Sequence, residues 1–300
     1  MARPPRVAVV GHVEWVDVVA VDHLPRPGEI VHASGIRSRA GGGGAMAAFQ
    51  LAALAGSCTF LCALGDDRTG DDALGDLEAR GVTVRAVRRA GKGQRRAITL
   101  LDAAHERSIV VARERLVPWG SDDLGWDDAA TWDAVYVTGG DAAAVRAARA
   151  AKVVVATPRA RDALVEAGIV LDVVVGSASD GGERVDETLA ALARTVVQTE
   201  GAAGGHWRPG GASDDLAEAR LCDAAGAGRW SAAPLPGTPH DSYGCGDTFA
   251  AGLTYALGAG LPLPDACALG ARCGAATLCL PAPDVASAAT LLDGAPLRVA

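Results

Sequence analysis

The chain has 300 residues, 49% of them hydrophobic, and a formal net charge of -8 at pH 7. This length suffices for one large domain, and the apolar content excludes global disorder. The negative charge argues against binding to nucleic acid or to anionic membranes, since both require clustered basic side chains. An acidic protein can still bind a phosphorylated nucleotide through backbone amides and a metal ion.

The cysteines and the N-terminal residues indicate the compartment. The seven cysteines are an odd number and lack the paired spacing of zinc sites, so we interpret them as buried thiols in a reducing environment. The first residues lack the basic and apolar regions of a signal peptide, and no apolar stretch is long enough to span a bilayer. The sequence therefore predicts a cytoplasmic protein.

Short β-rich runs alternate with alanine-rich helical patterns along most of the chain. We expect buried strands at Val7–Val10, Thr59–Ala63, Ala134–Val137, Val153–Ala156, Val173–Val175 and Thr195–Gln198. We expect helices at Ala45–Ala55, Asp72–Arg80, Ala142–Ala150, Arg161–Ala167, Asp186–Ala193, Gly246–Gly258 and Pro264–Leu278. This alternation predicts an α/β fold, with a mainly parallel central sheet and helices on both faces.

Two regions break this rhythm. Val16–Val21 with Glu29–Arg37, and Arg95–Asp102 with Arg107–Ala112, have the partial polar alternation of antiparallel strand pairs. Strands inserted at about residues 14–38 and 94–113 would form a small separate sheet. Because open α/β sheets bind ligands outside the carboxyl ends of their strands, we expect this sheet to be a lid over a cleft. We predict a single domain, residues 1–300, that carries the lid.

The strongest chemical signal is the segment from Asp241 to Asp247, directly before a helical pattern. Gly244 and Gly246, on either side of Cys245, leave backbone N–H groups unpaired, and with the helix dipole these form an anion site. Asp247 could accept a proton from an attacking hydroxyl, although an ordinary Asp cap fits the same pattern. A cysteine at a helix N-terminus can also have a lowered pKa and oxidise readily.

Four consecutive glycines, Gly41–Gly44, open the first long helical pattern. Such a run suits a close approach of the main chain to a ligand, and a flexible turn is the alternative. No G-x-x-x-x-G-K-[ST] motif occurs in the chain, so a P-loop nucleoside triphosphatase is excluded. A dinucleotide oxidoreductase is a poor alternative, because the first strand is not followed by G-x-G-x-x-G.

In this order along the chain, five segments resemble the PfkB (ribokinase-like) carbohydrate kinase family. They are the first strand at Val7–Gly11, the lid connection at Leu24–Glu29, the G-x-D-x-x-G stretch at Leu64–Gly70, the nucleotide loop at Thr199–Gly204 and the D-T-x-G-A-G-D signature at Asp241–Asp247. The likeness covers nearly the whole chain. It implies a ribokinase-like, three-layer αβα fold with a small β-sheet lid.

The resemblance implies an ATP-dependent phosphotransferase acting on a hydroxymethyl group of a sugar or sugar-like substrate. Asp247 would be the base, and the amides of Gly244, Cys245 and Gly246 would form the anion hole. The residues implied to contact the nucleotide are Thr199, Gly201, Gly204, Ser177 and Gly246. Those implied to contact the acceptor are Glu14, Asp17, Gly42, Gly43, Gly44 and Asp247.

The resemblance also implies metal ions, with one departure from the family pattern. Mg²⁺ is expected with the nucleotide phosphates, and Asp241 with the carbonyl of Tyr243 resembles a site for a monovalent cation such as K⁺. Where the family has N-x-x-E, this chain has Ser177 to Asp180, and Asp180 could orient metal-bound water. A catalytically silent nucleotide- or sugar-binding protein and a nucleoside kinase therefore stay open as alternatives. A homodimer through the lid is expected, because exposed sheet surfaces favour pairing.

Overall fold

The computed structural model of the chain describes residues 3–103, 107–212 and 226–293. Its main sheet has nine strands, in the order β13-β12-β11-β10-β9-β8-β1-β4-β5. They are β1 (Val7–Val10), β4 (Cys58–Gly65), β5 (Val82–Arg89), β8 (Ala134–Val137), β9 (Val154–Ala156), β10 (Leu171–Ser177), β11 (Ala193–Thr199), β12 (Gly205–Pro209) and β13 (Gly228–Trp230). Neighbours from β11 to β5 are parallel, and β12 and β13 add an antiparallel edge.

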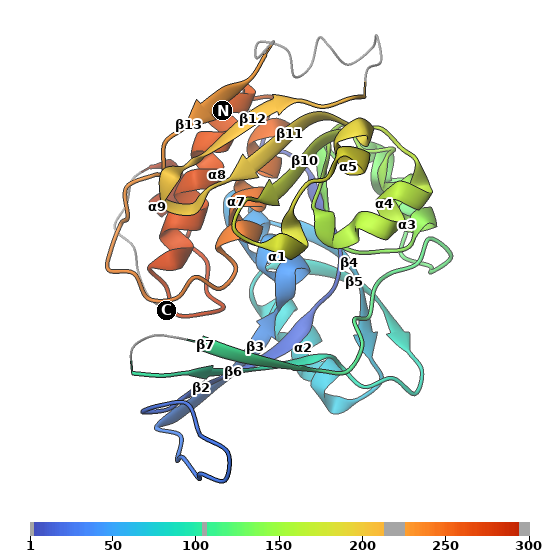
Figure 1. Cartoon of the computed structure of the whole chain (residues 1–300). Helices are drawn as coiled ribbons and strands as arrows, with labels where there is room; N and C mark the ends of the chain where they lie inside the picture. Colours follow the sequence, from blue (N-terminus) through green and yellow to red (C-terminus); the bar gives the residue numbers. More distant parts are fainter. Residues whose placement is uncertain (1–2, 104–106, 213–225, 294–300) are drawn as a thin grey trace.

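Helices cover both faces of this sheet (Figure 1). They are α1 (Gly42–Ala55), α2 (Arg68–Ala79), α3 (Ala142–Ala148), α4 (Arg161–Ala167), α5 (Glu187–Leu192), α7 (Cys245–Gly258), α8 (Leu263–Leu278) and α9 (Ala288–Leu292). Helices α3, α4 and α5 lie on one face, and α1, α7 and α8 lie on the other. The described residues contain no helix with the length and apolarity needed to cross a membrane.

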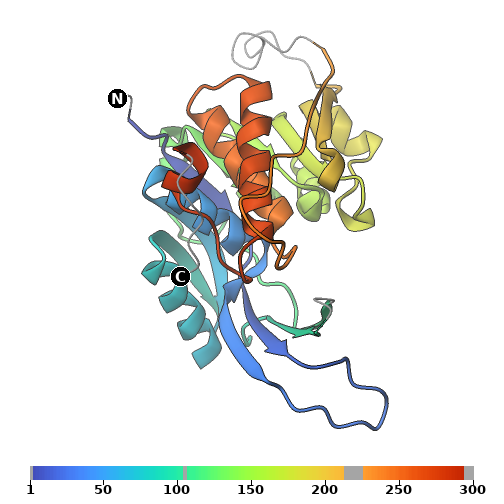
Figure 2. The same ribbon diagram turned by 90° about the vertical axis from the view of Figure 1, so that its left-hand side faces the viewer.

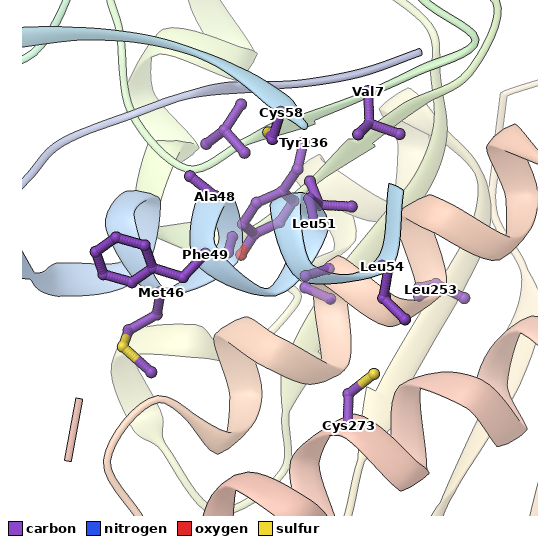
Figure 3. Packing of buried hydrophobic residues seen from close by; sticks show 14 of the residues in the cluster. Val7, Met46, Ala48, Phe49, Leu51, Leu54, Cys58, Tyr136, Leu253 and Cys273 are labelled. Carbon is purple, nitrogen blue, oxygen red and sulfur yellow. The ribbon is translucent and has the colours of Figure 1, made fainter. Parts of the chain in front are cut away.

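The strands of the parallel core are apolar on both faces because each face packs against helices. In β1, Val7 and Val9 belong to the core beneath α1, α7 and α8, whereas Ala8 and Val10 belong to the core beneath α3, α4 and α5. Figure 3 shows the first of these cores, with Phe49 and Leu51 of α1 among the side chains drawn. The sheet therefore holds its carboxyl ends rigidly, and these ends carry the loops of the candidate site.

The lid is a second sheet with strand order β3-β2-β6-β7. Its strands are β2 (Glu14–Ala20), β3 (Gly35–Gly41), β6 (Arg96–Leu101) and β7 (Arg107–Ala112). The pairs β2–β3 and β6–β7 are antiparallel as predicted, and β2 and β6 join them in parallel. The strand predicted at Glu29–Arg37 instead lies at Gly35–Gly41, and residues 29–34 belong to the connection. The lid projects from the body of the protein, with the connection between β2 and β3 at its far end (Figure 2). The predicted three-layer fold with a small β-sheet lid is confirmed.

Strands β5, β12 and β13 were absent from the sequence prediction. Strand β5 lies at the sheet edge and alternates apolar residues with arginines, and those arginines are held by ion pairs such as Arg85–Asp128 and Arg89–Asp122. Such a strand lacks the apolar run used to find the others. In β12 and β13, stacking of Trp207 on Trp230 supplies the packing that an apolar run supplies elsewhere.

Candidate active site

Asp247 lies in the first turn of α7, at the carboxyl end of the parallel sheet. The turn before it requires Gly244, whose φ is 76° and whose missing side chain makes room for Met46 of α1. Helix α7 begins with the N–H of Thr248 donating to the carbonyl of Gly244 at 2.9 Å. The amides of the preceding turn have no acceptor within the helix and lie at the positive end of its dipole. This end of α7 is therefore suited to an anion.

The two glycine segments, which are about 200 residues apart in the sequence, meet in the structure. A side chain at Gly43 would place its Cβ 2.7 Å from Oδ1 of Asp247. The backbone N–H of Gly42 donates to the hydroxyl of Tyr243 at 2.7 Å, and Gly44 packs against the main chain of His12. The start of α1 therefore lies directly against the carboxylate of Asp247, and the roles of acceptor site and base stay predictions.

The predicted nucleotide loop reaches the same place. Thr199 ends β11, and Gly201 and Gly204 bound the short turn that follows, which is closed by the N–H of Glu200 donating to the carbonyl of Gly204 at 2.8 Å. A narrow cavity joins this loop to the start of α7, and Thr199, Glu183, Gly246 and Asp247 are among its lining residues. The space is only about 10 Å³, so it places Thr199 near Asp247 but holds no phosphate chain as it stands.

Burial and neighbouring charges shift the pKa of the Asp247 carboxylate. Burial raises the pKa of Asp247 to about 6, and the carboxylates of Glu183 and Glu14 add to the rise. The guanidinium groups of Arg159 and Arg115 act in the opposite direction. A general base works best when its pKa lies near the working pH, and this value meets that condition.

Glu14 stands on the acceptor side of the site. Its Oε1 accepts a hydrogen bond from Nε of Arg95 at 2.6 Å, and Nε2 of His12 lies 3.7 Å from the same oxygen. Burial and the nearby arginines hold the pKa of His12 well below its ordinary value, so the imidazole is neutral. Arg95 thus fixes Glu14 in the lid, and the second carboxylate oxygen of Glu14 can accept a hydrogen bond from a hydroxyl group.

Asp17 is placed differently from Glu14. The two residues are three positions apart on β2, so their side chains lie on opposite faces of the lid. The carboxylate of Asp17 accepts hydrogen bonds from Ser38 and from Arg96, both at 2.5 Å. The role of Asp17 toward an acceptor stays a prediction, and the geometry favours Glu14.

The N-x-x-E region folds so that Glu183 faces the reaction centre. Asp180 caps the following turn by accepting the N–H of Gly182 at 2.8 Å, and Ser177 accepts the N–H of Asp180 at 3.3 Å. Glu183 lines the narrow cavity beside Gly246 and Asp247, and is paired with Arg159. Sequence reasoning missed Glu183, although Asp180-Gly-Gly-Glu183 repeats the predicted acidic spacing three residues later.

These residues fit a Mg²⁺ ion held mainly by substrate. The described residues contain no group of three or more His, Cys, Asp or Glu side chains that could hold a metal ion. Mg²⁺ often takes only one or two protein carboxylates, with water and nucleotide phosphates completing its shell. Asp180 carries no ion pair among the described residues, whereas Glu183 is already paired with Arg159, so Mg²⁺ at Glu183 would have to replace that pair.

The predicted cation site at Asp241 and Tyr243 is occupied by protein groups. Oδ1 of Asp241 accepts the N–H of Tyr243 at 2.8 Å and Nη1 of Arg107 at 3.0 Å. Because the guanidinium already neutralises this carboxylate, the residues do not fit a monovalent cation while Arg107 is in place.

The alternative of a reactive Cys245 thiol is wrong. Burial raises the pKa of Cys245 to about 12, and the carboxylates of Asp241 and Asp247 act in the same direction. Its backbone N–H, at the first position of α7, donates to the carbonyl of Ser242 at 3.4 Å, so an anion in the predicted anion hole would have to replace that long hydrogen bond. The cysteines described in the structure are free thiols, and Cys222 lies outside the described residues.

A lid over the carboxyl ends of a parallel sheet, with two glycine loops meeting at an aspartate, defines the ribokinase-like class of kinase folds. The family model described as "pfkB family carbohydrate kinase" matches residues 4–173 and 140–285. The chain belongs to the pfkB family of carbohydrate kinases.

Two curated relatives match part of the chain. It is 32% identical over 76 residues to a ribokinase from Dictyostelium discoideum, and 40% identical over 92 residues to an ATP-dependent ribose-1-phosphate kinase from Halopiger xanaduensis. These stretches are 25% and 30% of this chain, and the chain spans 24% and 30% of the relatives' own lengths. Among solved structures, the microbiome-derived acarbose kinase Mak1 aligns with a TM-score of 0.75 at 23% identity, covering 96% of this chain and 98% of that one.

Proposed function

We propose that this protein transfers the γ-phosphate of ATP to a hydroxymethyl group of a sugar or sugar-like acceptor. The observation that carries the proposal is the contact between the two glycine segments, which leaves Asp247 beside both the start of α1 and the anion site of α7. Membership of the pfkB family supports the reaction class, and the name of the Halopiger xanaduensis relative supports ATP as the donor.

In this reaction Asp247 takes the proton of the attacking hydroxyl. Bound MgATP supplies the phosphoryl group and the charge that balances its phosphates. The amides of Gly244, Cys245 and Gly246 stabilise negative charge that develops on the transferred group, an effect worth roughly 3 kcal/mol for each well-placed donor. Thr199 and the loop to Gly204 position the nucleotide.

The lid orients the acceptor and keeps water away from it. Glu14, fixed by Arg95, accepts a hydrogen bond from a hydroxyl group of the sugar. Gly42 and Gly43 allow the sugar to approach the main chain. Water is a competing nucleophile for the γ-phosphate, so closure of the lid favours transfer over hydrolysis.

The experiment measures phosphoryl transfer from ATP to a panel of sugars, sugar phosphates and nucleosides. We expect at least one acceptor to be phosphorylated, and Asp247→Asn to lower kcat by about 10²–10⁴-fold with little change in ATP binding. Binding without turnover across the panel would support the catalytically silent alternative instead. Near-normal turnover by the variant would remove Asp247 from the role of base.

The lid also supports the proposed homodimer. Ile36, Ile109, Val110 and Val111 on its strands are exposed, with 68% of Ile36 and 61% of Val110 accessible. Strand register places Ile36 and Val110 on one face of the lid and Ile109 and Val111 on the other, so the face of Ile36 and Val110 is the proposed contact surface. Light scattering after size exclusion should give a dimer, and Val110→Glu should shift it toward the monomer.

A further inference from the structure

A cavity of about 540 Å³ opens beside the proposed acceptor site, where β8, β9 and β10 end. Its walls include glycines and the chain that follows the lid. Its charged lining residues are Arg115, Arg159, Arg161, Asp162, Asp180 and Glu183. The proposed mechanism assigns most of these no role.

Most of this charge is compensated within the protein. Arg159 is paired with Glu183, and Nε of Arg161 lies 2.7 Å from Oδ2 of Asp186. Asp180 is held by the N–H of Gly182. These groups shape the cavity but leave little net charge for a ligand.

Arg115 is the exception. Its guanidinium is half-buried and donates only to the carbonyl of Arg159, at 3.4 Å, and no carboxylate lies within ion-pair distance among the residues that the structure describes. Burial and then the like charges of Arg95 and Arg159 lower the pKa of Arg115, while the carboxylates of Glu14 and Asp247 act in the opposite direction, and arginine remains charged. Glu14 is paired with Arg95 and Glu183 with Arg159, so Arg115 is a half-buried cation without a carboxylate in direct contact, and an external anion can supply that contact.

The cavity lies next to the reacting groups. A side chain built at Gly139, in the cavity wall, would come within 3.7 Å of Gly11 and 3.8 Å of the backbone nitrogen of His12. The Nε2 of His12 would in turn lie 3.3 Å from a side chain at Gly42. The imidazole is buried, and its Nδ1 has no hydrogen-bond partner in the described part of the chain. The wall of the cavity thus continues into the start of α1, where Asp247 lies.

We propose that this cavity binds an oxyanion substituent of the acceptor, a phosphate or a carboxylate, with Arg115 as the residue that selects it. The inference rests on the proposed kinase function and names the acceptor class: an anionic sugar rather than a neutral one. The hydroxymethyl end of the acceptor lies at Asp247, and its anionic end lies at Arg115, because Arg159 is already paired with Glu183.

The phosphates of ATP are the other anionic groups that could occupy the cavity beside Arg115. The narrow cavity that joins Thr199 to Asp247 is not lined by Arg115, Arg159 or Arg161, and Glu183 stands between the two cavities. Asp180 and Glu183, the candidates for Mg²⁺, nevertheless line the larger cavity, so nucleotide phosphates and an anionic acceptor compete for it, and the KM for ATP of an Arg115 variant distinguishes them.

The test compares each neutral sugar with its phosphate ester and with its carboxylic acid as acceptors for the full chain. We expect an anionic acceptor to have the higher kcat/KM. Because Arg115 also lowers the pKa of Asp247, the comparison is made at pH 8, where that carboxylate is ionised. There Arg115→Met should lower the ratio of kcat/KM for the anionic acceptor to kcat/KM for the neutral sugar by about tenfold to a hundredfold, with the KM for ATP unchanged. Arg115→Lys should retain part of the preference. The matched control is Arg146→Met, a remote exposed arginine that donates to the carbonyls of Glu166 and Ala167.

Calorimetry with the same sugar phosphates, without ATP, separates this inference from the kinase proposal. Binding that Arg115→Met abolishes supports the anion site even where no acceptor turns over. A neutral sugar preferred over all its anionic forms would overturn the inference and leave the kinase function standing. A rise in the KM for ATP with equal losses for neutral and anionic acceptors would assign Arg115 to the nucleotide and overturn it too.

Discussion

Arg107, at the start of lid strand β7, donates from Nη1 to Oδ1 of Asp241 at 3.0 Å. The side chain of Asp241 is only 4% exposed, and its Oδ1 also accepts the N–H of Tyr243. A lid residue thus neutralises a buried carboxylate at the base of the loop that precedes α7. The position of the lid and the shape of the proposed anion hole are connected through this pair.

The first prediction concerns monovalent cations. With Arg107 in place we expect the same turnover in K⁺ and in Na⁺ buffers. Arg107→Met leaves Asp241 buried and unpaired, a state that a cation relieves, so turnover of this variant should become dependent on K⁺. Initial rates across a K⁺ titration at constant ionic strength measure both. Activation of the wild type by K⁺, with no change in the variant, would contradict the prediction.

The second prediction concerns the contact between the two glycine segments. Gly43→Ala would place a methyl carbon 2.7 Å from Oδ1 of Asp247, so the carboxylate must move. We expect kcat to fall about a hundredfold, because a displacement near 1 Å is enough to misalign a reacting group. Steady-state rates with saturating ATP measure the loss.

The matched control for this variant is Gly75→Ala. Gly75 is an exposed residue of α2, and a side chain there would meet nothing within 4 Å. This variant should keep its turnover and gain roughly 0.5–1 kcal/mol of stability from the better helix former. Equal turnover of the two variants would show that the Gly43 contact does not position Asp247.

Much of the fold could be predicted where apolar patterns are unbroken. Strands β1 and β8 begin and end at the predicted residues, because runs such as Val7–Val10 are buried on both faces. The pattern failed at β5, where Arg85 and Arg89 face partners from distant loops. Local sequence cannot show those partners, so an edge strand held by ion pairs resembles a solvated segment.

In the candidate site too, residues in short local motifs could be predicted, and residues that only the fold brings together could not. Asp247 and the glycines around it follow from short motifs, because turns and helix starts depend on local backbone chemistry. Glu183, Arg115 and Arg159 follow strands in loops of no recognisable pattern, and only the fold brings them to one cavity. Asp17 shows that sequence patterns do not fix which face of a strand a side chain occupies, since a shift of one residue moves it to the other face.

The third prediction decides which carboxylate serves Mg²⁺. Glu183→Gln should raise the Mg²⁺ concentration needed for half-maximal rate by about tenfold, the usual effect of removing a group that supports a bound metal. Asp180→Asn should have less effect, because asparagine can still accept the N–H of Gly182. Rates over a Mg²⁺ titration at fixed ATP make the comparison. A larger effect of Asp180→Asn would return the role to the residue predicted from the sequence.

The fourth prediction uses the charges around Asp247 to shift its titration. Glu183 raises the pKa of Asp247 and Arg159 lowers it. In the wild type kcat/KM should rise with pH through an apparent pKa near 6, as Asp247 loses its proton. Glu183→Gln should move this limb to lower pH, and Arg159→Met should move it to higher pH. Profiles of kcat/KM at saturating Mg²⁺ test the signs, and shifts in the same direction for both variants would contradict them.

The raised pKa of Asp247 also predicts how the fold responds to pH. A carboxylate whose pKa is about 6 in the folded state, against an ordinary 3.8, stabilises the fold fully below the ordinary value. That contribution is lost as the pH rises through 6, and above that pH the ionised carboxylate costs on the order of 3 kcal/mol. Asp247→Asn removes this cost, so its melting temperature should exceed that of the wild type at pH 8. At pH 4 the two should nearly coincide, because Asp247 is then protonated. Thermal unfolding across this range tests it, and a gain that does not grow with pH would mean that Asp247 is not the group that titrates.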